Sequence, residues 1–358
     1  MMNNTYITQS KILGIATAVP PFQMKQSDVA RVTKELFGTS FSNFERLQQI
    51  YGNAAINTRY SCVPISWYSE AHGFKDRNAL FVKHAVNLLE EAATRALIQA
   101  GLTPADIDVV VSVSTSGIAT PSLDALIIER MQLRRDVERL PIFGLGCVGG
   151  VVGLARAGQM ASSRPGTNVL FLVVELCGLT FRRDDHSKSN VIATALFGDG
   201  AAAAIISTNH SSIMGGPKIR ASGEHTWPGT LDVMGWNVED DGFGVLFSQN
   251  IPTVIKNNYR KALDYFLSKN ELSLDQIDRF AMHPGGARVV SALEEALDLE
   301  PNALTESRTV LSDFGNMSAV TVLFVLEQIL SDNQPFHKIL LSSLGPGFTA
   351  GFLVLEPS

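Results

Sequence analysis

The sequence predicts a layered α/β fold made of two similar halves, residues 1–214 and 215–358. Short apolar runs typical of buried strands alternate with amphipathic helical stretches along the chain. The same order of elements then occurs a second time, which indicates an internal duplication. Equivalent loops of two such halves are expected to meet where the halves pack together.

The first matching unit is a helix, a turn and a strand. In both halves a Leu-Thr or Leu-Ser step ends the helix, and Ile-Asp begins the strand. The helix, turn and strand are residues 88–101, 102–108 and 109–113 in the first half and 258–271, 272–278 and 279–282 in the second.

Later units keep the same order. Residues 141–146, a short predicted strand, run into a helix from 147 to 161, and residues 310–315 run into a helix from 316 to 330 in the matching place. The remaining matches are the strands 169–174 and 339–343, the glycine turns 198–200 and 345–347, and the final strands 201–207 and 348–356. The first half also carries an extra segment, roughly residues 177–197.

Composition excludes several classes of protein. The formal charge is −6 and there is no basic run, so we expect no nucleic-acid partner. The longest apolar runs, such as Val169–Val174, are too short to span a bilayer, and the N-terminus lacks the pattern of a signal peptide. Three widely spaced cysteines without a CxxC pair argue against a disulfide framework or a metal site and favour a reducing cytoplasm.

Cys147 is the candidate nucleophile. It lies between Gly146 and Val148-Gly149-Gly150, where a strand is expected to turn into a helix. The positive end of a helix dipole favours thiolate, and backbone N–H groups in such a turn can hold a thioester carbonyl. The alternative is a small cysteine buried at a packed helix start.

His283 and Asn316 occupy related places in the second half. His283 ends a strand before Pro284-Gly285-Gly286, and Asn316 fills the slot that Cys147 holds in the first half. Taken singly, the histidine fits a turn cap and the asparagine a helix N-cap. Together with a thiol, both side chains can donate to one oxygen and stabilise an enolate, although a Cys/His hydrolase uses similar residues.

These motifs together resemble the type III polyketide synthases, the chalcone-synthase-like branch of the thiolase superfamily. The resemblance covers nearly the whole chain and rests on the order and spacing of several short motifs. They are Thr115-Ser116-Gly117, Gly146-Cys147, Leu196-Phe197-Gly198-Asp199-Gly200-Ala201, His283-Pro284-Gly285-Gly286, Gly315-Asn316-Met317-Ser318 and Gly345-Pro346-Gly347-Phe348.

The resemblance implies a five-layered αβαβα thiolase-like fold and a homodimer. Cys147 would accept a starter acyl group from acyl-CoA, and His283 would help to hold it as thiolate. His283 and Asn316 would bind the malonyl-CoA carbonyl while CO₂ leaves. No bound cofactor, metal or carrier protein is implied, which agrees with the lack of nucleotide-binding and metal-spaced motifs.

The same resemblance assigns the walls of the substrate cavity. Phe197 matches a gatekeeper and Pro346 a support of the cavity, although a core aromatic and an ordinary turn are the plain alternatives. Val245 stands where the plant enzymes have a second gatekeeper phenylalanine. The other expected cavity residues are Cys177, Thr180, Ser116, Ser318 and Thr120, the last reaching toward the partner subunit.

Two further features concern the substrates. Residues 175–190, 234–236 and 240–242 look closer to bacterial alkylresorcinol and alkylpyrone synthases than to plant enzymes, which implies a medium- or long-chain fatty acyl starter. The basic CoA entrance of the plant enzymes is thin here: Arg46 and Arg59 remain as candidates, with Gly285 and Gly286.

Two other functions stay open from the sequence. A single-round 3-ketoacyl synthase that initiates fatty acid synthesis shares Cys, His and Asn, and would stop after one condensation. A catalytically silent acyl-binding scaffold is the non-enzyme alternative, although such a protein is expected to have lost part of the trio Cys147, His283 and Asn316.

Overall fold

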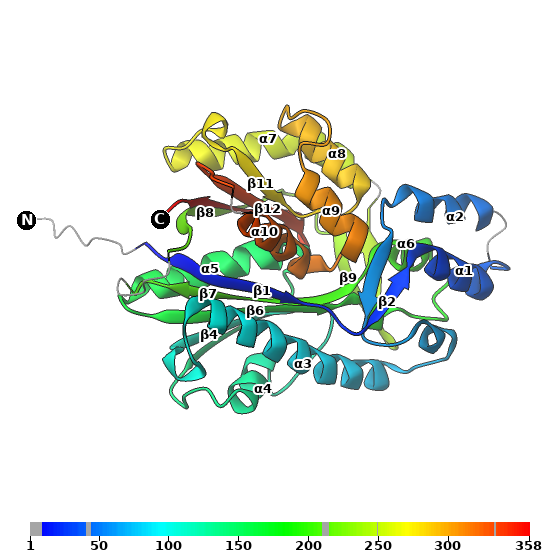
Figure 1. Cartoon of the computed structure of the whole chain (residues 1–358). Coiled ribbons are helices and arrows are strands. Elements are labelled where there is room, and N and C mark those ends of the chain that lie inside the picture. Colours follow the sequence, from blue (N-terminus) through cyan, green and yellow to red (C-terminus); the bar gives the residue numbers. More distant parts are fainter. Residues whose placement is uncertain (1–8, 41–43, 210–214, 249, 333) are drawn as a thin grey trace, which may run out of the picture.

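A computed structural model describes residues 9–40, 44–209, 215–248, 250–332 and 334–358 (Figure 1). The predicted boundary between the halves, after residue 214, falls at the end of the stretch 210–214, outside the described residues. The strands are β1 (Lys11–Ala18), β2 (Phe22–Lys25), β3 (Thr58–Ser61), β4 (Val109–Val113), β5 (Glu138–Ile142), β6 (Asn168–Leu176), β7 (Asp199–Ser207), β8 (Lys218–Thr226), β9 (Met234–Glu239), β10 (Gly242–Phe247), β11 (Arg279–Met282), β12 (Ile339–Gly345) and β13 (Thr349–Glu356).

Ten α-helices and several short 3-10 helices connect these strands within the described residues. The α-helices are α1 (Gln26–Phe37), α2 (Phe44–Asn53), α3 (Phe74–Ala100), α4 (Leu123–Arg130), α5 (Gly149–Ser163), α6 (Lys188–Leu196), α7 (Ile251–Lys269), α8 (Ala287–Ala296), α9 (Thr305–Phe314) and α10 (Thr321–Ser331). The 3-10 helices are η1 (Ile65–Ser69), η2 (Pro104–Asp106), η3 (Gly146–Val148), η4 (Cys177–Thr180), η5 (Leu274–Gln276) and η6 (Ser318–Val320).

The strand order confirms the predicted duplication. In the first half β4 pairs with β6 in parallel, β6 with β7 and β7 with β1 in antiparallel; β11, β12, β13 and β8 repeat these pairings in the second half. The two half-sheets join edge to edge through β1 and β8, with only Lys11 and Lys218 in register. A separate ribbon of two strands, β9 and β10, lies outside this sheet.

One predicted equivalence is wrong in its local structure. β5 extends the first half-sheet beside β4, but residues 310–314, at the matching position, form the end of helix α9. Polar Ser312 and Asp313 interrupt that segment, whereas a helix can turn them outward and bury Val310 and Leu311 on its other face. The described second half therefore has four strands in the sheet where the first has five.

The elements stack in five layers, as the thiolase-like fold requires (Figure 1). Helices α5 and α10 form the middle layer and share one apolar core with the inner faces of both half-sheets. The outer face of the first half-sheet packs on α3 and α4, and that of the second packs on α7 and α8. Along β4, for example, Val109, Val111 and Val113 face the middle layer while Val110 faces α3, because side chains alternate along a strand.

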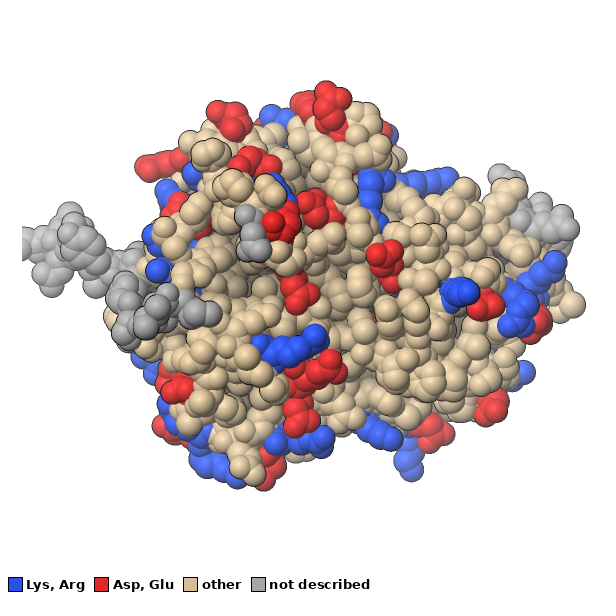
Figure 2. Space-filling view, viewed as in Figure 1, with Lys and Arg blue, Asp and Glu red and all other residues tan. Residues whose placement is uncertain are grey.

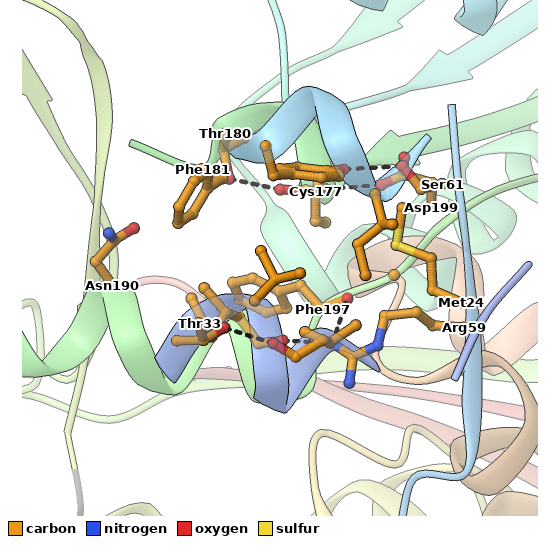
Figure 3. Close-up of a pocket in the computed structure, with 18 of the residues that line it drawn as sticks. Met24, Thr33, Arg59, Ser61, Cys177, Thr180, Phe181, Asn190, Phe197 and Asp199 are labelled. Carbon is orange, nitrogen blue, oxygen red and sulfur yellow. Dashed lines mark hydrogen bonds between the residues drawn. The ribbon is translucent and has the colours of Figure 1, made fainter. Parts of the chain in front are cut away.

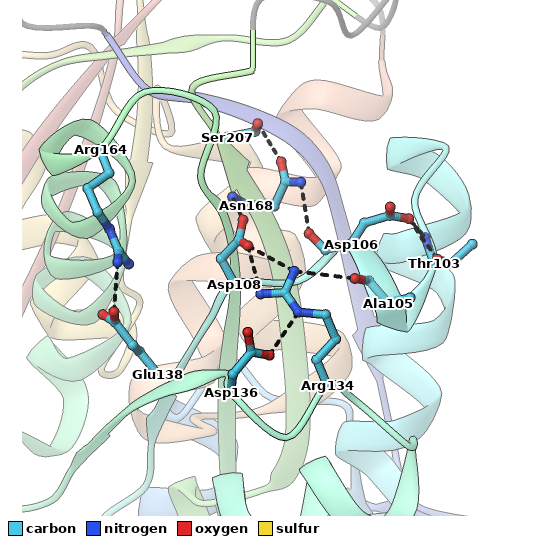
Figure 4. A network of polar contacts seen from close by, with 10 residues as sticks. All are labelled: Thr103, Ala105, Asp106, Asp108, Arg134, Asp136, Glu138, Arg164, Asn168 and Ser207. Carbon is cyan, nitrogen blue, oxygen red and sulfur yellow. Dashed lines mark hydrogen bonds and ion pairs between the residues drawn. The ribbon is translucent and has the colours of Figure 1, made fainter.

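A network of hydrogen bonds and ion pairs joins the strand ends that lie farthest from the glycine turns at residues 198–200 and 345–347 (Figure 4). The Asp108 carboxylate accepts from the N–H of Asn168 at 2.8 Å and pairs with Arg134 at 3.1 Å, which ties β4 to β6. In the second half, Asp278 accepts from the N–H groups of His337 and Lys338. In both halves an aspartate therefore fixes the strand register at one end of the strands. The loops with the candidate catalytic residues lie at the opposite end.

The surface agrees with the modest net charge. On the face shown in Figure 2, basic and acidic side chains are interspersed rather than gathered by sign. Within the described part of the chain, no helix combines the length and the apolar character needed to cross a membrane.

Candidate active site

Cys147 lies in η3, between the end of β5 and the start of α5. Gly146 before it has φ 50°, and a Cβ there would meet Pro346 Cδ at 2.6 Å, so only glycine fits this turn. The Gly146 N–H donates to Thr115 Oγ1 at 3.0 Å, and the Cys147 carbonyl accepts from Ser343 Oγ at 2.6 Å. Both halves of the chain therefore fix the backbone that carries the thiol.

Asn316 and His283 approach from the second half. The Asn316 Nδ2 donates to the Gly285 carbonyl at 3.1 Å, and its Oδ1 accepts from the Ser318 N–H at 2.8 Å. This orientation leaves one Nδ2 proton free for a ligand. His283 follows β11 and is only 4% exposed, yet neither of its ring nitrogens has a hydrogen-bond partner in the structure.

Ser318 joins the thiol to this second half. The Cys147 Sγ donates to Ser318 Oγ at 3.4 Å, while the Ser318 N–H fixes Asn316, whose amide in turn contacts the turn after His283. The structure thus brings together the three predicted catalytic residues and Ser318, at the ends of equivalent elements. Pro346 packs against Gly146, which precedes Cys147 in the chain.

Burial shifts the pKa values of both titratable groups toward their neutral forms. Desolvation raises the pKa of Cys147 to about 12; its hydrogen bond with Ser318 lowers the value only in part, and the charge of Glu175 raises it. Desolvation lowers the pKa of His283 to about 3. Low-polarity surroundings thus favour a neutral thiol and a neutral imidazole.

Sequence reasoning missed Glu175, a buried carboxyl near this site. It is 0% exposed and accepts from the N–H groups of Thr115 and Ser116 at 3.0 and 2.9 Å, which fixes the loop that supports Gly146. Desolvation raises its pKa to about 7 despite these hydrogen bonds. The signal that could have identified it is a lone glutamate inside the apolar run of β6, because a fully buried glutamate is rare.

An apolar pocket opens beside the site (Figure 3). Helix α1 lines it with Val29, Val32 and Leu36. Four of the residues predicted to line the cavity contribute to its wall: Phe197, Cys177, Thr180 and Val245. Phe197 also pairs with Asn316 in an isolated backbone bridge, so the pocket wall and the candidate amide donor are adjacent in the fold.

The other predicted cavity residues lie elsewhere. Ser116 lines a smaller neighbouring cavity, which Thr180 and Phe243 also border, and Ser318 contacts the thiol directly. Thr120 is exposed at the surface of this chain, in the cis peptide Thr120-Pro121.

The expected role of Arg59 in holding CoA phosphates finds no support in its geometry. Arg59 is 4% exposed and donates to the carbonyls of Thr194, Ala195 and Phe197 and to Gln26 Oε1, so it binds the end of α6. Desolvation lowers its pKa to about 10, with neighbouring acidic groups acting in the opposite direction. The sequence could not distinguish a buried arginine from a surface one.

The remaining CoA candidates are only partly placed. Arg46 belongs to α2, but its side chain is outside the described residues. Gly285 and Gly286 form the turn before α8, and a Cβ at Gly285 would lie 3.6 Å from His283 Nε2. Their lack of side chains leaves room next to the imidazole.

Trp236 is the second functional residue that sequence reasoning did not assign. Its indole N–H donates to the Thr115 carbonyl at 3.0 Å, and its ring meets Phe197 edge-on with centroids 6.4 Å apart. A tryptophan in a short ribbon gave no indication that it would reach the loop beside Cys147.

Comparison with known proteins assigns this site to a family. Residues 3–210 match the family model of the N-terminal domain of chalcone and stilbene synthases, and residues 218–357 match the model of the C-terminal domain. The chain is similar to 1,3,6,8-tetrahydroxynaphthalene synthase of Streptomyces peucetius subsp. caesius, with 37% identity over 97% of this chain and 93% of that protein. It is also similar to the alpha-pyrone synthesis polyketide synthase-like Pks18 of Mycobacterium tuberculosis, with 28% identity over 98% and 91% of the two chains.

The fold agrees with a solved structure. The crystal structure of 1,3,6,8-tetrahydroxynaphthalene synthase from Streptomyces coelicolor, a bacterial type III polyketide synthase, matches with a TM-score of 0.92 and 26% identity, over 97% of this chain and 99% of that one. Neither a ketoacyl synthase nor a silent scaffold is needed to explain these matches. The chain belongs to the chalcone and stilbene synthase family and is a type III polyketide synthase.

Proposed function

We propose that this synthase extends a medium- or long-chain fatty acyl-CoA with malonyl-CoA and closes the product to an alkylpyrone or alkylresorcinol. The observation that carries the proposal is the apolar pocket behind Phe197. Helix α1 supplies aliphatic side chains to its wall, including Val29 and Leu36. A saturated acyl chain gains free energy by leaving water for such a surface, whereas a malonyl starter has no apolar chain to place there.

The first step is transfer of the starter. Cys147 loses its proton to an unpaired nitrogen of His283, and its Sγ attacks the thioester carbonyl. The new S–C bond forms as the bond to the CoA sulfur breaks, and the leaving thiolate takes the proton from His283. Proton transfer and attack proceed together, so a free thiolate–imidazolium pair, which burial disfavours, does not accumulate.

The second step is decarboxylative condensation. The free Nδ2 proton of Asn316 and the N–H of neutral His283 donate to the malonyl thioester oxygen. The C–CO₂ bond breaks, and its electron pair forms the enolate, which these two donors stabilise without a permanent positive charge. The enolate carbon then attacks the acyl group on Cys147, whose sulfur leaves as thiolate.

Repeated condensation yields a chain that closes in one of two ways. Attack of an enol oxygen on the terminal thioester gives a pyrone and releases the thiol. Aldol closure between two carbons with loss of water and aromatisation leaves an aryl thioester; its hydrolysis frees the thiol, and loss of the resulting carboxyl as CO₂ gives a resorcinol core. Both products keep the alkyl chain of the starter.

The substrates and assembly follow from the same proposal. Acyl-CoA and malonyl-CoA are the partners, and no bound cofactor enters either step. The N-terminus of α8, with Gly285 and Gly286 before it, is the proposed contact for a CoA phosphate. Edge strand β5 and exposed Phe143 beside it form the proposed face of a homodimer in the cytoplasm.

The test uses purified protein, labelled malonyl-CoA and fatty acyl-CoAs of increasing chain length, with products identified by mass spectrometry. We expect alkylated pyrones or resorcinols and preference for the longer starters. Products made from malonyl-CoA alone, at rates that fatty acyl-CoAs do not exceed, would overturn the assignment of the starter. Release of acyl acids without any condensation would overturn the synthase mechanism.

A further inference from the structure

The ribbon of β9 and β10 has no strand partner in the central sheet. Within the described residues its two strands pair only with each other, from Gly242 opposite Glu239 to Phe247 opposite Met234. A two-stranded ribbon is marginally stable alone. Its position over the rest of the fold therefore depends on side-chain contacts.

The ribbon covers the site with one residue from each strand. Trp236 of β9 and Val245 of β10 stand opposite each other. Trp236 contacts Phe197 and donates to the carbonyl of Thr115, whose hydroxyl holds Gly146, while Val245 lines the pocket. A shift of the ribbon therefore changes the space around Phe197.

Arg77, a residue of α3, binds the turn of the ribbon. It is 4% exposed, and its guanidinium donates both to the Phe181 carbonyl at 2.9 Å and to the Asp241 carbonyl at the turn of the ribbon. Phe74, one turn earlier in α3, meets Phe243 edge-on with centroids 5.4 Å apart. The start of α3 thus contacts both the ribbon and the loop after η4.

Arg182, in the loop after η4, also binds the turn of the ribbon. Its side chain is 15% exposed and pairs with the Asp241 carboxylate at 2.7 Å and the Asp185 carboxylate at 3.3 Å. Gly244 of β10 makes this possible, because a Cβ there would lie 2.8 Å from Arg182 Nη1. Asn190 of α6 fixes the loop itself by donating to the carbonyls of Arg182 and Asp185.

We propose that Arg77 and Arg182 are positioning residues that hold the β9–β10 ribbon over the reaction chamber and thereby set how far the polyketide is extended before release. Both arginines converge on Asp241, one on its carbonyl and one on its carboxylate. We call these two contacts of Arg77 and Arg182 with Asp241 the clasp. Breaking the clasp lets Trp236 and Val245 move more freely over the growing chain. A looser cover lets short intermediates escape or close early, so it alters product length more than the rate of the first condensation.

The test weakens the clasp at its more accessible pair. The variants are Arg182→Gln, Asp241→Asn and the charge exchange Arg182→Asp with Asp241→Arg. The matched control is Arg183→Gln, since the neighbouring Arg183 pairs with exposed Asp184 at 3.8 Å and forms no ion pair with the described residues of the ribbon. Arg77→Lys, which keeps the charge but not the fork of donors, is the second probe.

Three readouts separate positioning from general damage. We expect the ratio of early-released to full-length product to rise about two- to fivefold in Arg182→Gln and Asp241→Asn, in line with one partly exposed ion pair. The rate of the first condensation should stay within about twofold of wild type. Hydrogen exchange of residues 234–247 should accelerate, and the charge exchange should restore both the ratio and the protection.

Two results would overturn the proposal. One is a product ratio in Arg182→Gln and Asp241→Asn equal to that in Arg183→Gln, with all three folded. The other is a changed ratio without any change in exchange of the ribbon. If Arg182→Gln does not fold, the exposed Asp241→Asn variant decides the question alone.

The inference rests on iterative condensation but not on the identity of the starter. The assay uses whichever starter the wild-type protein extends, malonyl-CoA alone included. Failure of the fatty starter proposal appears in the wild-type products, whereas failure of the clasp appears only in the comparison among variants.

Discussion

Phe197 and Asn316 are joined through their backbones across the two halves of the chain. The Gly198 N–H donates to the Asn316 carbonyl at 3.0 Å, and the Asn316 N–H donates to the Leu196 carbonyl at 2.8 Å. Phe197 and Asn316 are therefore held together by two backbone hydrogen bonds. Changes that displace α6 are expected to reach the chemistry through this bridge.

Cys147→Ala separates transfer from decarboxylation. We expect product formation to fall at least about a thousandfold, because no thiol remains to hold the starter. Release of labelled CO₂ from malonyl-CoA should continue, since His283 and Asn316 stay in place. A variant that still makes alkylated product would show that the starter is held elsewhere.

Asn316→Asp tests the amide donor at nearly constant shape. The carboxylate still accepts from the Ser318 N–H, but it loses the hydrogen bond to the Gly285 carbonyl, cannot donate to the enolate and adds a negative charge. We expect malonyl-CoA decarboxylation to fall about a hundred- to a thousandfold. A matched thermal melt provides the control, and wild-type decarboxylation in this variant would contradict the assigned role.

The reactivity of Cys147 should follow pH well above neutrality. A thiol pKa raised to about 12 means that thiolate is the minor form at neutral pH and increases with pH toward that value. Alkylation by iodoacetamide should therefore rise about tenfold per pH unit between about pH 7 and pH 9 in the substrate-free protein. Peptide mass spectrometry measures it, with buried Cys62 and Cys177 as internal references. A plateau in this range would mean that an ion pair with His283 already holds the thiolate.

Ala193→Phe should shorten the accepted starter. Ala193 of α6 lines the apolar pocket, so the larger ring removes room for an alkyl chain. We expect kcat/KM for the longest starters to fall by about tenfold or more, with short starters little affected. Ala30→Phe is the matched control, because Ala30 of α1 faces a separate surface groove. Equal losses for short and long starters would argue against a chain-binding pocket.

The part of the fold that the sequence predicted best lies in the central sheet. The strands 109–113 and 279–282 were predicted with their observed limits, because buried parallel strands read as continuous apolar runs. Helix α3 begins at Phe74, well before the predicted start at residue 88, since the repeat identified only its second part. Residues 310–314 were misjudged because duplication preserves position in the chain better than it preserves a single edge strand.

The sequence predicts the site residues whose chemistry follows from their own side chain. It does not predict features that depend on contacts between distant segments. Cys147, His283 and Asn316 follow from motif and position. The burial of Arg59, the desolvation of the thiol and the reach of Trp236 to Thr115 depend on which distant segments meet. The periodicity of apolar residues along the chain does not show which distant segments come into contact.

The edge-to-edge joint at Lys11 and Lys218 has a consequence for how the protein is made. A ribosome completes the half that carries Cys147 while β12 and β13, which cover the far side of α5, are still unsynthesised. Until they emerge, the apolar middle layer has only one wall, and exposed surface of this kind promotes aggregation of nascent chains. The nascent enzyme thus acquires protection of its core and completion of its chemistry in the same late event.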